Sequence, residues 1–263
     1  MRFSPPVGRG SGERNGPALS PALLIRGDQR LPLQDPLVVP SNLVKTGVDL
    51  RSCFLRDCDP ARSEIADQAG FPRHATAIRQ REFTAGRICA AAAMRELEYA
   101  AHAVDVARDR SPVWPVGLVG SISHTSELAA AAVARTTSGV RAIGLDLEHA
   151  SALEDDLIDE ICVPREREWL AGQPAQRRGV LAKVIFCAKE AAYKCQYPLT
   201  GEMFGFETFG IDLSLDRGLF SARFLHAVGN FSRGDRLDGH IWIAANHFVA
   251  LVISAQIPAM ADA

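Results

Sequence analysis

The sequence predicts an α+β protein made of two halves of similar size. Segments of helix-forming composition are followed by strand-like segments, and this order occurs twice, once on each side of about Val140. The first helix-forming segment, residues 74–100, is rich in Ala, Arg, Glu and Leu, and the second covers residues 181–196. No internal sequence repeat accompanies this order.

The strands are predicted from alternation and from short apolar runs. Residues 117–124 predict a strand that ends in a polar turn, whereas residues 129–135 fit either a strand or a helix. Three or four more strand-like runs lie within residues 206–257, and Pro164 is expected to separate two helices. Segment 141–149 alternates throughout, with Ile143, Leu145 and Leu147 expected on one face and Gly144, Asp146 and Glu148 on the other.

The first forty residues differ in composition from the rest of the chain. They contain seven of the fifteen prolines together with five glycines, so we expect segment 1–40 to be extended or mobile. Its apolar pieces at 22–25 and 37–39 can still lie along the body of the protein. The two halves are then expected at residues 41–140 and 141–257.

The composition argues against several classes of protein. The 263 residues are 47% hydrophobic and 23% charged, which is typical of a soluble globular protein. A net charge of −2 gives no overall attraction to nucleic acid or to an anionic membrane, and we expect neither as a partner. The start lacks a signal-peptide core, and no apolar run reaches the roughly 20 residues of a membrane helix. The six cysteines form no C-x-x-C pair, which favours free thiols in a cytoplasmic protein.

Asp146 and Glu148 are the first candidates for a functional site. They are two residues apart on a predicted strand, so both carboxylates project from one face and repel unless a cation or a proton neutralises them. Such oxygen ligands suit Mg²⁺, which takes waters and substrate phosphates for the rest of its coordination sphere. The alternative is a solvated sheet edge. In both cases we expect the two carboxylates at the surface.

Lys189, Glu190 and Lys194 lie on the second predicted helix. Glu190 and Lys194 are four residues apart, which fits an ordinary surface salt bridge of about 0.2–0.5 kcal/mol. In the alternative, Glu190 binds a metal ion or acts as a base, and the lysines hold phosphate oxygens as point charges.

Arg79, Phe83 and Arg87 fall four residues apart along one stripe of the first predicted helix. Arginine forks suit phosphate oxygens, although a solvated helix face explains this stripe equally well. His124 ends the run at 120–124, whose small residues allow backbone N–H groups to approach an anion closely. A histidine that merely hydrogen-bonds in a turn is the simpler explanation for this position.

Taken in order, these segments resemble the 4′-phosphopantetheinyl transferases of the type that includes the surfactin and enterobactin synthetase activators, and most closely the enterobactin-type branch. The shared motifs are EF-x-x-x-R at 82–87, P-x-WP at 112–115, G-S-x-S-H at 120–124, G-x-D-x-E at 144–148 and F-x-x-K-E-x-x-Y-K at 186–194. The resemblance covers about half of the chain, residues 79–209. Five motifs in one order are far more specific than any one of them.

The resemblance implies an α+β fold of two pseudo-symmetric halves, with the coenzyme A site in the cleft between them. It implies Mg²⁺-dependent transfer of phosphopantetheine from coenzyme A to a serine of an acyl or peptidyl carrier protein, which activates fatty-acid, polyketide or nonribosomal-peptide (siderophore) synthases. The implied metal ligands are Asp146, Glu148 and Glu190, the implied catalytic residues are Glu190 and Lys194, and the implied coenzyme A contacts are Arg79, Arg87, Arg110, Ser123, His124, Lys189 and Lys194.

Details of this resemblance leave some roles open. Leu147 in the middle of D-x-E suggests that only Asp146 and Glu148 bind metal from that strand, and Arg110 stands where some relatives carry lysine. Glu190 is expected to be the base for the serine hydroxyl, directly or through a metal-bound water. Two halves in one chain make a monomer the expected state.

Two other functions are compatible with the same residues. A magnesium-dependent phosphohydrolase would use the same carboxylates to cleave a pyrophosphate with water. A non-catalytic module that binds coenzyme A or carrier proteins would be favoured if Glu190 or Asp146 were missing, and both are present.

Overall fold

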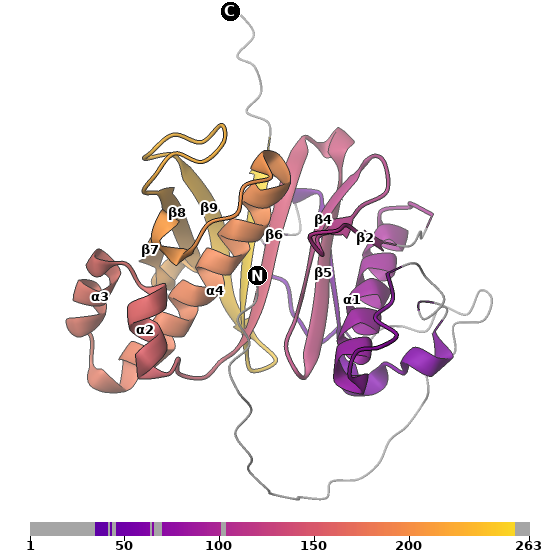
Figure 1. Cartoon of the computed structure of the whole chain (residues 1–263), viewed down its shortest axis with the longest axis horizontal. Coiled ribbons are helices and arrows are strands. Elements are labelled where there is room, and N and C mark those ends of the chain that lie inside the picture. The colour runs from indigo at the N-terminus through magenta and orange to yellow at the C-terminus, as the bar shows by residue number, and fades with distance from the viewer. Residues whose placement is uncertain are drawn as a thin grey trace, which may run out of the picture.

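The computed structural model describes residues 35–41, 43, 46–63, 65, 70–100 and 104–255 of the 263-residue chain (Figure 1). Most of the predicted extended segment 1–40, including the piece at 22–25, lies outside the described residues. In its described part Leu37 packs into the core, and its N–H donates to the Ser52 hydroxyl at 3.1 Å. No helix within the described ranges is long and apolar enough to cross a membrane.

The N-terminal half is a three-stranded antiparallel sheet in the order β1-β5-β4, with helix α1 on one face. The ambiguous segment at 129–135 belongs to the central strand β5, because its small side chains are buried on both faces, against α1 and against the C-terminal half. The elements of this half are β1 (Val48–Phe54), η2 (Leu55–Asp57), η3 (Pro60–Arg62), α1 (Ala77–Glu96), β2 (Asp105–Val106), β3 (Pro112–Val113), β4 (Leu118–His124), β5 (Leu128–Arg135) and η5 (Thr136–Ser138).

The C-terminal half is a five-stranded antiparallel sheet in the order β6-β10-β9-β8-β7, covered by the long helix α4. Pro164 is the first residue of α3 and separates it from α2, as predicted. The elements are β6 (Val140–His149), α2 (Asp155–Ile161), α3 (Pro164–Ala171), α4 (Ala175–Thr200), η6 (Phe206–Thr208), β7 (Phe209–Ser214), η7 (Leu215–Arg217), β8 (Leu219–Phe224), β9 (Arg236–Ala244) and β10 (His247–Ala255).

The two halves share one architecture. In each half the first strand pairs antiparallel with the last, β1 with β5 and β6 with β10, and a long helix follows the first strand in sequence. Figure 1 shows α1 and α4 on the outer sides of the two sheets. The predicted α+β fold with two similar halves is confirmed.

The sheets meet where β4 lies beside the outer edge of β6. There the backbone N–H groups of Leu145 and Leu147 donate to the hydroxyls of Ser121 (3.0 Å) and Ser123 (3.1 Å). Serine side chains therefore satisfy the edge of β6 in place of a neighbouring strand. The other face of β6 packs its apolar side chains against β5 and β10, which confirms the predicted alternation.

Candidate active site at the junction of the two halves

Gly144 allows helix α4 to lie directly against the acidic face of β6. A Cβ atom at this position would lie 1.8 Å from the carbonyl oxygen of Ala191 and 2.6 Å from the backbone nitrogen of Cys195. Only glycine fits such an approach of helix backbone to strand backbone. The same face of β6 carries Asp146 and Glu148, so both carboxylates lie next to α4.

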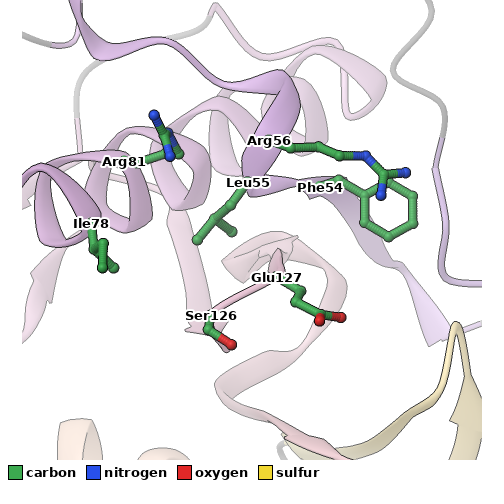
Figure 2. Close-up of a pocket in the computed structure, with 7 residues that line it drawn as sticks. All are labelled: Phe54, Leu55, Arg56, Ile78, Arg81, Ser126 and Glu127. Carbon is green, nitrogen blue, oxygen red and sulfur yellow. The ribbon is translucent and has the colours of Figure 1, made fainter. Parts of the chain in front are cut away.

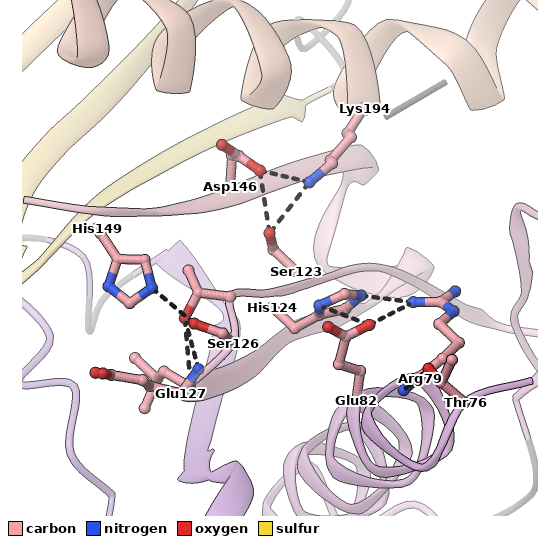
Figure 3. Close-up of polar contacts among 12 residues, drawn as sticks. Thr76, Arg79, Glu82, Ser123, His124, Ser126, Glu127, Asp146, His149 and Lys194 are labelled. Carbon is pink, nitrogen blue, oxygen red and sulfur yellow. Dashed lines mark hydrogen bonds and ion pairs between the residues drawn. The ribbon is translucent and has the colours of Figure 1, made fainter. Parts of the chain in front are cut away.

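Asp146 is completely buried, which corrects the expectation of a surface carboxylate. Its Oδ1 forms an ion pair with the Lys194 ammonium at 2.7 Å and accepts a hydrogen bond from the Ser123 hydroxyl at 3.0 Å (Figure 3). Lys194 also donates to Ser123 Oγ and to the Leu145 carbonyl. The buried negative charge is therefore balanced by a cation from α4.

Glu148 follows Asp146 on the same face of β6, and both Glu148 and Glu190 are half-buried. Glu148 Oε2 lies 3.4 Å from the ammonium of Lys183, a residue of α4. Glu190 lies one turn before Lys194 on α4. Burial, and after it the charge of Glu190, raises the pKa of Tyr193, which places the two side chains near each other.

Ser123 contributes an interior hydroxyl. The side chain is buried, and its oxygen donates to Asp146 while it accepts from Leu147 N–H and from Lys194. A hydroxyl has one proton and two acceptor positions, so all of them are used here. Ser123 thus joins the two halves, and its expected contact with coenzyme A stays a prediction.

Lys189 does not join the cluster of Asp146 and Lys194. Its ammonium is buried in the C-terminal half, where it pairs with Glu166 Oε2 (2.9 Å) and donates to the carbonyls of Ile161 (2.8 Å) and Phe206 (2.9 Å). Three acceptors use the three N–H donors of the ammonium. This placement keeps the Lys189 ammonium apart from the Asp146–Lys194 pair and does not support its expected approach to the pyrophosphate.

Arg79 and His124 come together from different elements of the N-terminal half. Arg79 Nη1 donates to His124 Nε2 at 2.8 Å and pairs with Glu82 Oε2 at 3.1 Å (Figure 3). His124 Nδ1 lies 3.6 Å from the same carboxylate oxygen. Because Nε2 accepts from the guanidinium, the histidine is neutral in this arrangement, with its proton on Nδ1 facing Glu82.

Arg87 lies two turns after Arg79 along the predicted stripe. Its guanidinium carbon is 3.8 Å from the centroid of the buried Phe83 ring, a cation–π contact. Burial, and then the charge of Arg79, lowers the pKa of Arg87 to about 10. The two arginines therefore lie close enough for their charges to interact, as a shared anion site requires.

Arg110 sits in the turn between β2 and β3, in a left-handed backbone conformation with φ of 71°. The preceding residue, Asp109, accepts a hydrogen bond from the Tyr197 hydroxyl. That bond, first among several, lowers the pKa of Asp109 to about 2. Tyr197 lies one turn after Lys194 on α4, so this contact brings the turn of Arg110 beside the C-terminal half.

The structure adds groups that the sequence analysis did not single out. Within the described part of the chain, the set of three possible ligand atoms that lie within 4.8 Å of one another comes from Glu127, His149 and His247. Asp146, Glu148 and Glu190 are not that close together. The signals that were present are the turn position of Glu127, three residues after the G-S-x-S-H motif, and the position of His149 directly after D-x-E.

A pocket of about 320 Å³ lies between the start of α1, the end of β1 and the β4–β5 turn (Figure 2). None of the predicted site residues lines it. Its walls are formed by Phe54, Leu55, Arg56, Ile78, Arg81, Ser126 and Glu127.

Comparison with protein families matches both halves of the chain. Residues 67–134 match the 4′-phosphopantetheinyl transferase N-terminal domain, and residues 142–241 match the 4′-phosphopantetheinyl transferase superfamily. Together the two matches contain every predicted site residue.

Individual relatives agree with these matches. The chain is 35% identical to the 4′-phosphopantetheinyl transferase Svp of Streptomyces mobaraensis over 76% of this chain and 82% of the relative. It is 31% identical to the 4′-phosphopantetheinyl transferase PptT of Mycobacterium tuberculosis over 68% of this chain and 78% of the relative. It is 36% identical to enterobactin synthase component D of Escherichia coli over 46% of this chain and 57% of the relative.

The comparisons identify a group-transfer enzyme from a family that uses coenzyme A. The chain belongs to the 4′-phosphopantetheinyl transferase superfamily.

Proposed function

We propose that this enzyme transfers 4′-phosphopantetheine from coenzyme A to a serine of an apo carrier protein, with Mg²⁺ held by Asp146, Glu148 and Glu190. The observation that carries the site is the buried Asp146–Lys194 pair at the junction of the halves. A buried carboxylate paired with a lysine, beside two more carboxylates, is a group of charges arranged for an anionic substrate and a cation. The matched family supports the reaction.

The chemistry of the donor set fits Mg²⁺, and because the three carboxylates do not all lie within 4.8 Å of one another, they would have to move together to hold one ion. Three carboxylates supply hard oxygen ligands, and the half-buried positions of Glu148 and Glu190 leave room for substrate phosphate and water. In the structure Lys194 and Lys183 lie against Asp146 and Glu148 and balance their charge. Bound Mg²⁺ would supply a Lewis acid that stabilises the charge developing on the pyrophosphate.

The chain's own residues then have distinct tasks. Glu190 takes the proton of the carrier serine, whose hydroxyl attacks the phosphorus that bears pantetheine, so that 3′,5′-adenosine diphosphate leaves. Lys194 holds the pyrophosphate oxygens: its ammonium lies at Asp146, its side chain keeps 22% exposure, and one of its three hydrogen bonds would be exchanged for a phosphate oxygen.

The nucleotide end of coenzyme A is assigned to the N-terminal half. Arg79 and Arg87 supply guanidinium groups for the 3′-phosphate, and Arg110 supplies another from the turn held by Tyr197. In the structure Arg79 donates to His124, so an arriving phosphate would take over the donors of Arg79. The coenzyme A site is proposed to run along the junction between residues 41–140 and 141–257.

Mass spectrometry of carrier proteins tests this function. The enzyme is incubated with coenzyme A, MgCl₂ and apo carriers of fatty-acid, polyketide, nonribosomal-peptide and siderophore type, and at least one carrier is expected to gain one phosphopantetheine. Free phosphopantetheine without a gain of mass would indicate a hydrolase, and an unchanged coenzyme A pool would indicate a binding module. Glu190→Gln should abolish the gain, whereas Glu168→Gln, an exposed carboxylate on α3, should preserve it.

The remaining assignments concern the cellular setting. We propose a cytoplasmic monomer, which the six buried free thiols support, because free thiols persist in a reducing compartment. Light scattering during gel filtration should give the mass of one chain. A dimer mass would overturn the oligomeric assignment.

A further inference from the structure

A second cluster of potential ligands lies apart from the proposed magnesium site. Glu127 belongs to the turn between β4 and β5, His149 is the last residue of β6, and His247 is the first residue of β10. His149 and His247 are register partners, with ring centroids 4.6 Å apart. One possible ligand atom from each of the three residues lies within 4.8 Å of the other two. Because Glu127 belongs to the N-terminal half and the two histidines to the C-terminal half, both halves contribute to the cluster.

The hydrogen bonds of His247 fix its tautomer. The ring is completely buried, and Nδ1 donates to the Ala245 carbonyl at 2.6 Å. Thr125 Oγ1 accepts from the backbone N–H groups of Glu127 and Leu128, so its own proton points to His247 Nε2, 3.0 Å away. Nε2 therefore carries a lone pair, and a metal-binding imidazole commonly donates its other N–H to a carbonyl in this way.

The cluster has access from solvent. The Glu127 side chain is exposed, and Ser126 and Glu127 line the pocket of about 320 Å³ (Figure 2). Ser126 Oγ lies 3.1 Å from His149 Nε2, at the other side of the cluster (Figure 3). A cation can thus reach Glu127 first and then the two imidazoles behind it.

We propose that Glu127, His149 and His247 form a second cation site, for a divalent transition metal such as Zn²⁺. Two imidazoles and one carboxylate suit Zn²⁺ and leave a fourth position for water, whereas Mg²⁺ prefers oxygen ligands alone. On binding, His247 Nε2 exchanges the hydrogen bond from Thr125 for a bond to the metal. The metal then fastens the β4–β5 turn, which follows His124, to β6 and β10 of the other half.

Zinc titration of the full chain tests the site. The protein is stripped of metal, kept reduced, and titrated with Zn²⁺ against a chromogenic chelator. The wild type is expected to bind one Zn²⁺ per chain, in a manner that excess Mg²⁺ does not reverse. His149→Ala should weaken binding by more than about 100-fold, since loss of an outer partner of a ligand alone costs about 10- to 100-fold. Glu127→Gln should weaken it as well, and His226→Ala, an exposed histidine outside the cluster, should not.

Two further measurements separate this site from other zinc-binding groups. Co²⁺ in place of Zn²⁺ should show ligand-field bands without a thiolate charge-transfer band, because the six cysteines are buried elsewhere. Zn²⁺ should raise the unfolding temperature of the wild type but not of His149→Ala. Equal zinc affinity in wild type and His149→Ala, a thiolate band, or no binding at micromolar Zn²⁺ would each overturn the proposal. None of these readouts depends on transfer activity.

Discussion

The Asp146–Lys194 pair allows a quantitative comparison of two carboxylates that share one proposed role. Asp146 is fully buried, and one of its oxygens accepts from Lys194 at 2.7 Å and from Ser123 at 3.0 Å. Asp146→Asn leaves the ammonium without its counter-charge, and removing one partner of a buried pair costs about 3–5 kcal/mol. Lys194 keeps 22% of its side chain exposed, so water relieves part of this cost and we expect about 2–3 kcal/mol.

Glu148→Gln provides the matched comparison. Its contact with Lys183 is a single approach at 3.4 Å, and pairs of this kind contribute about 0–1 kcal/mol. Both variants should lose transfer activity, but only Asp146→Asn should lose substantial stability.

Urea unfolding of the two variants and the wild type measures the difference. The slope of the free energy of unfolding against urea must stay constant for the comparison to hold. Adding Lys194→Met to Asp146→Asn should recover part of the stability and none of the activity, because it removes the stranded charge. Equal free energies of unfolding for Asp146→Asn and Glu148→Gln would refute the conclusion that Asp146 and Lys194 form a buried, stabilising ion pair.

Four other outcomes follow from the geometry. Arg87→Ala should weaken the binding of coenzyme A by about 10- to 100-fold, because it removes one charge-assisted hydrogen bond worth about 1.5–3 kcal/mol. The binding of dephospho-coenzyme A, which lacks the 3′-phosphate, should hardly change. Equal losses of affinity for both ligands would make Arg87 a structural residue. Because the pKa of Arg87 is lowered to about 10, its charge is present below that pH and lost above it, so the calorimetric affinity for coenzyme A should fall as pH rises through about 10. Lys189→Met should cost about 3–5 kcal/mol in chemical unfolding by stranding the buried Glu166, with KM for coenzyme A largely kept. Ser123→Ala should destabilise the protein more than Ser121→Ala in the same assay, since Ser123 serves three partners and Ser121 is bonded to Leu145 N–H.

The sequence predicted most of the fold because its signals were local. Alternation along 141–149 fixed both the strand and the face that carries Asp146. Strand β5 stayed ambiguous because a run of buried alanines has no polar face, and its small side chains are explained only by the layers packed on both sides. Local pattern therefore identifies a strand whose two faces differ in polarity, such as β6, better than one that is apolar on both faces.

The candidate site was predicted less completely, for a physical reason. Spacing along a helix indicates which residues share a face, but it does not indicate which residues that face contacts in the folded protein. Lys189 and Lys194 belong to one motif, yet one ammonium is enclosed by Glu166 and two carbonyls, and the other reaches Asp146. The cluster of Glu127, His149 and His247 depends on strand register and on a turn from the other half, which no single segment encodes.

The junction between the halves explains why neither half alone carries the proposed site. The C-terminal half holds Asp146 and Lys194 as a nearly neutral pair, while the N-terminal half supplies Arg79 and Arg87, whose charges repel each other. An anion with several phosphates relieves the repulsion between the two arginines at one end and can pair with the Lys194 ammonium at the other. The hydroxyl of Ser123 ties β4, the strand that ends at His124, to β6, Asp146 and Lys194 of the other half. Binding at the junction should therefore depend on the contact between the sheets as much as on the charged residues themselves.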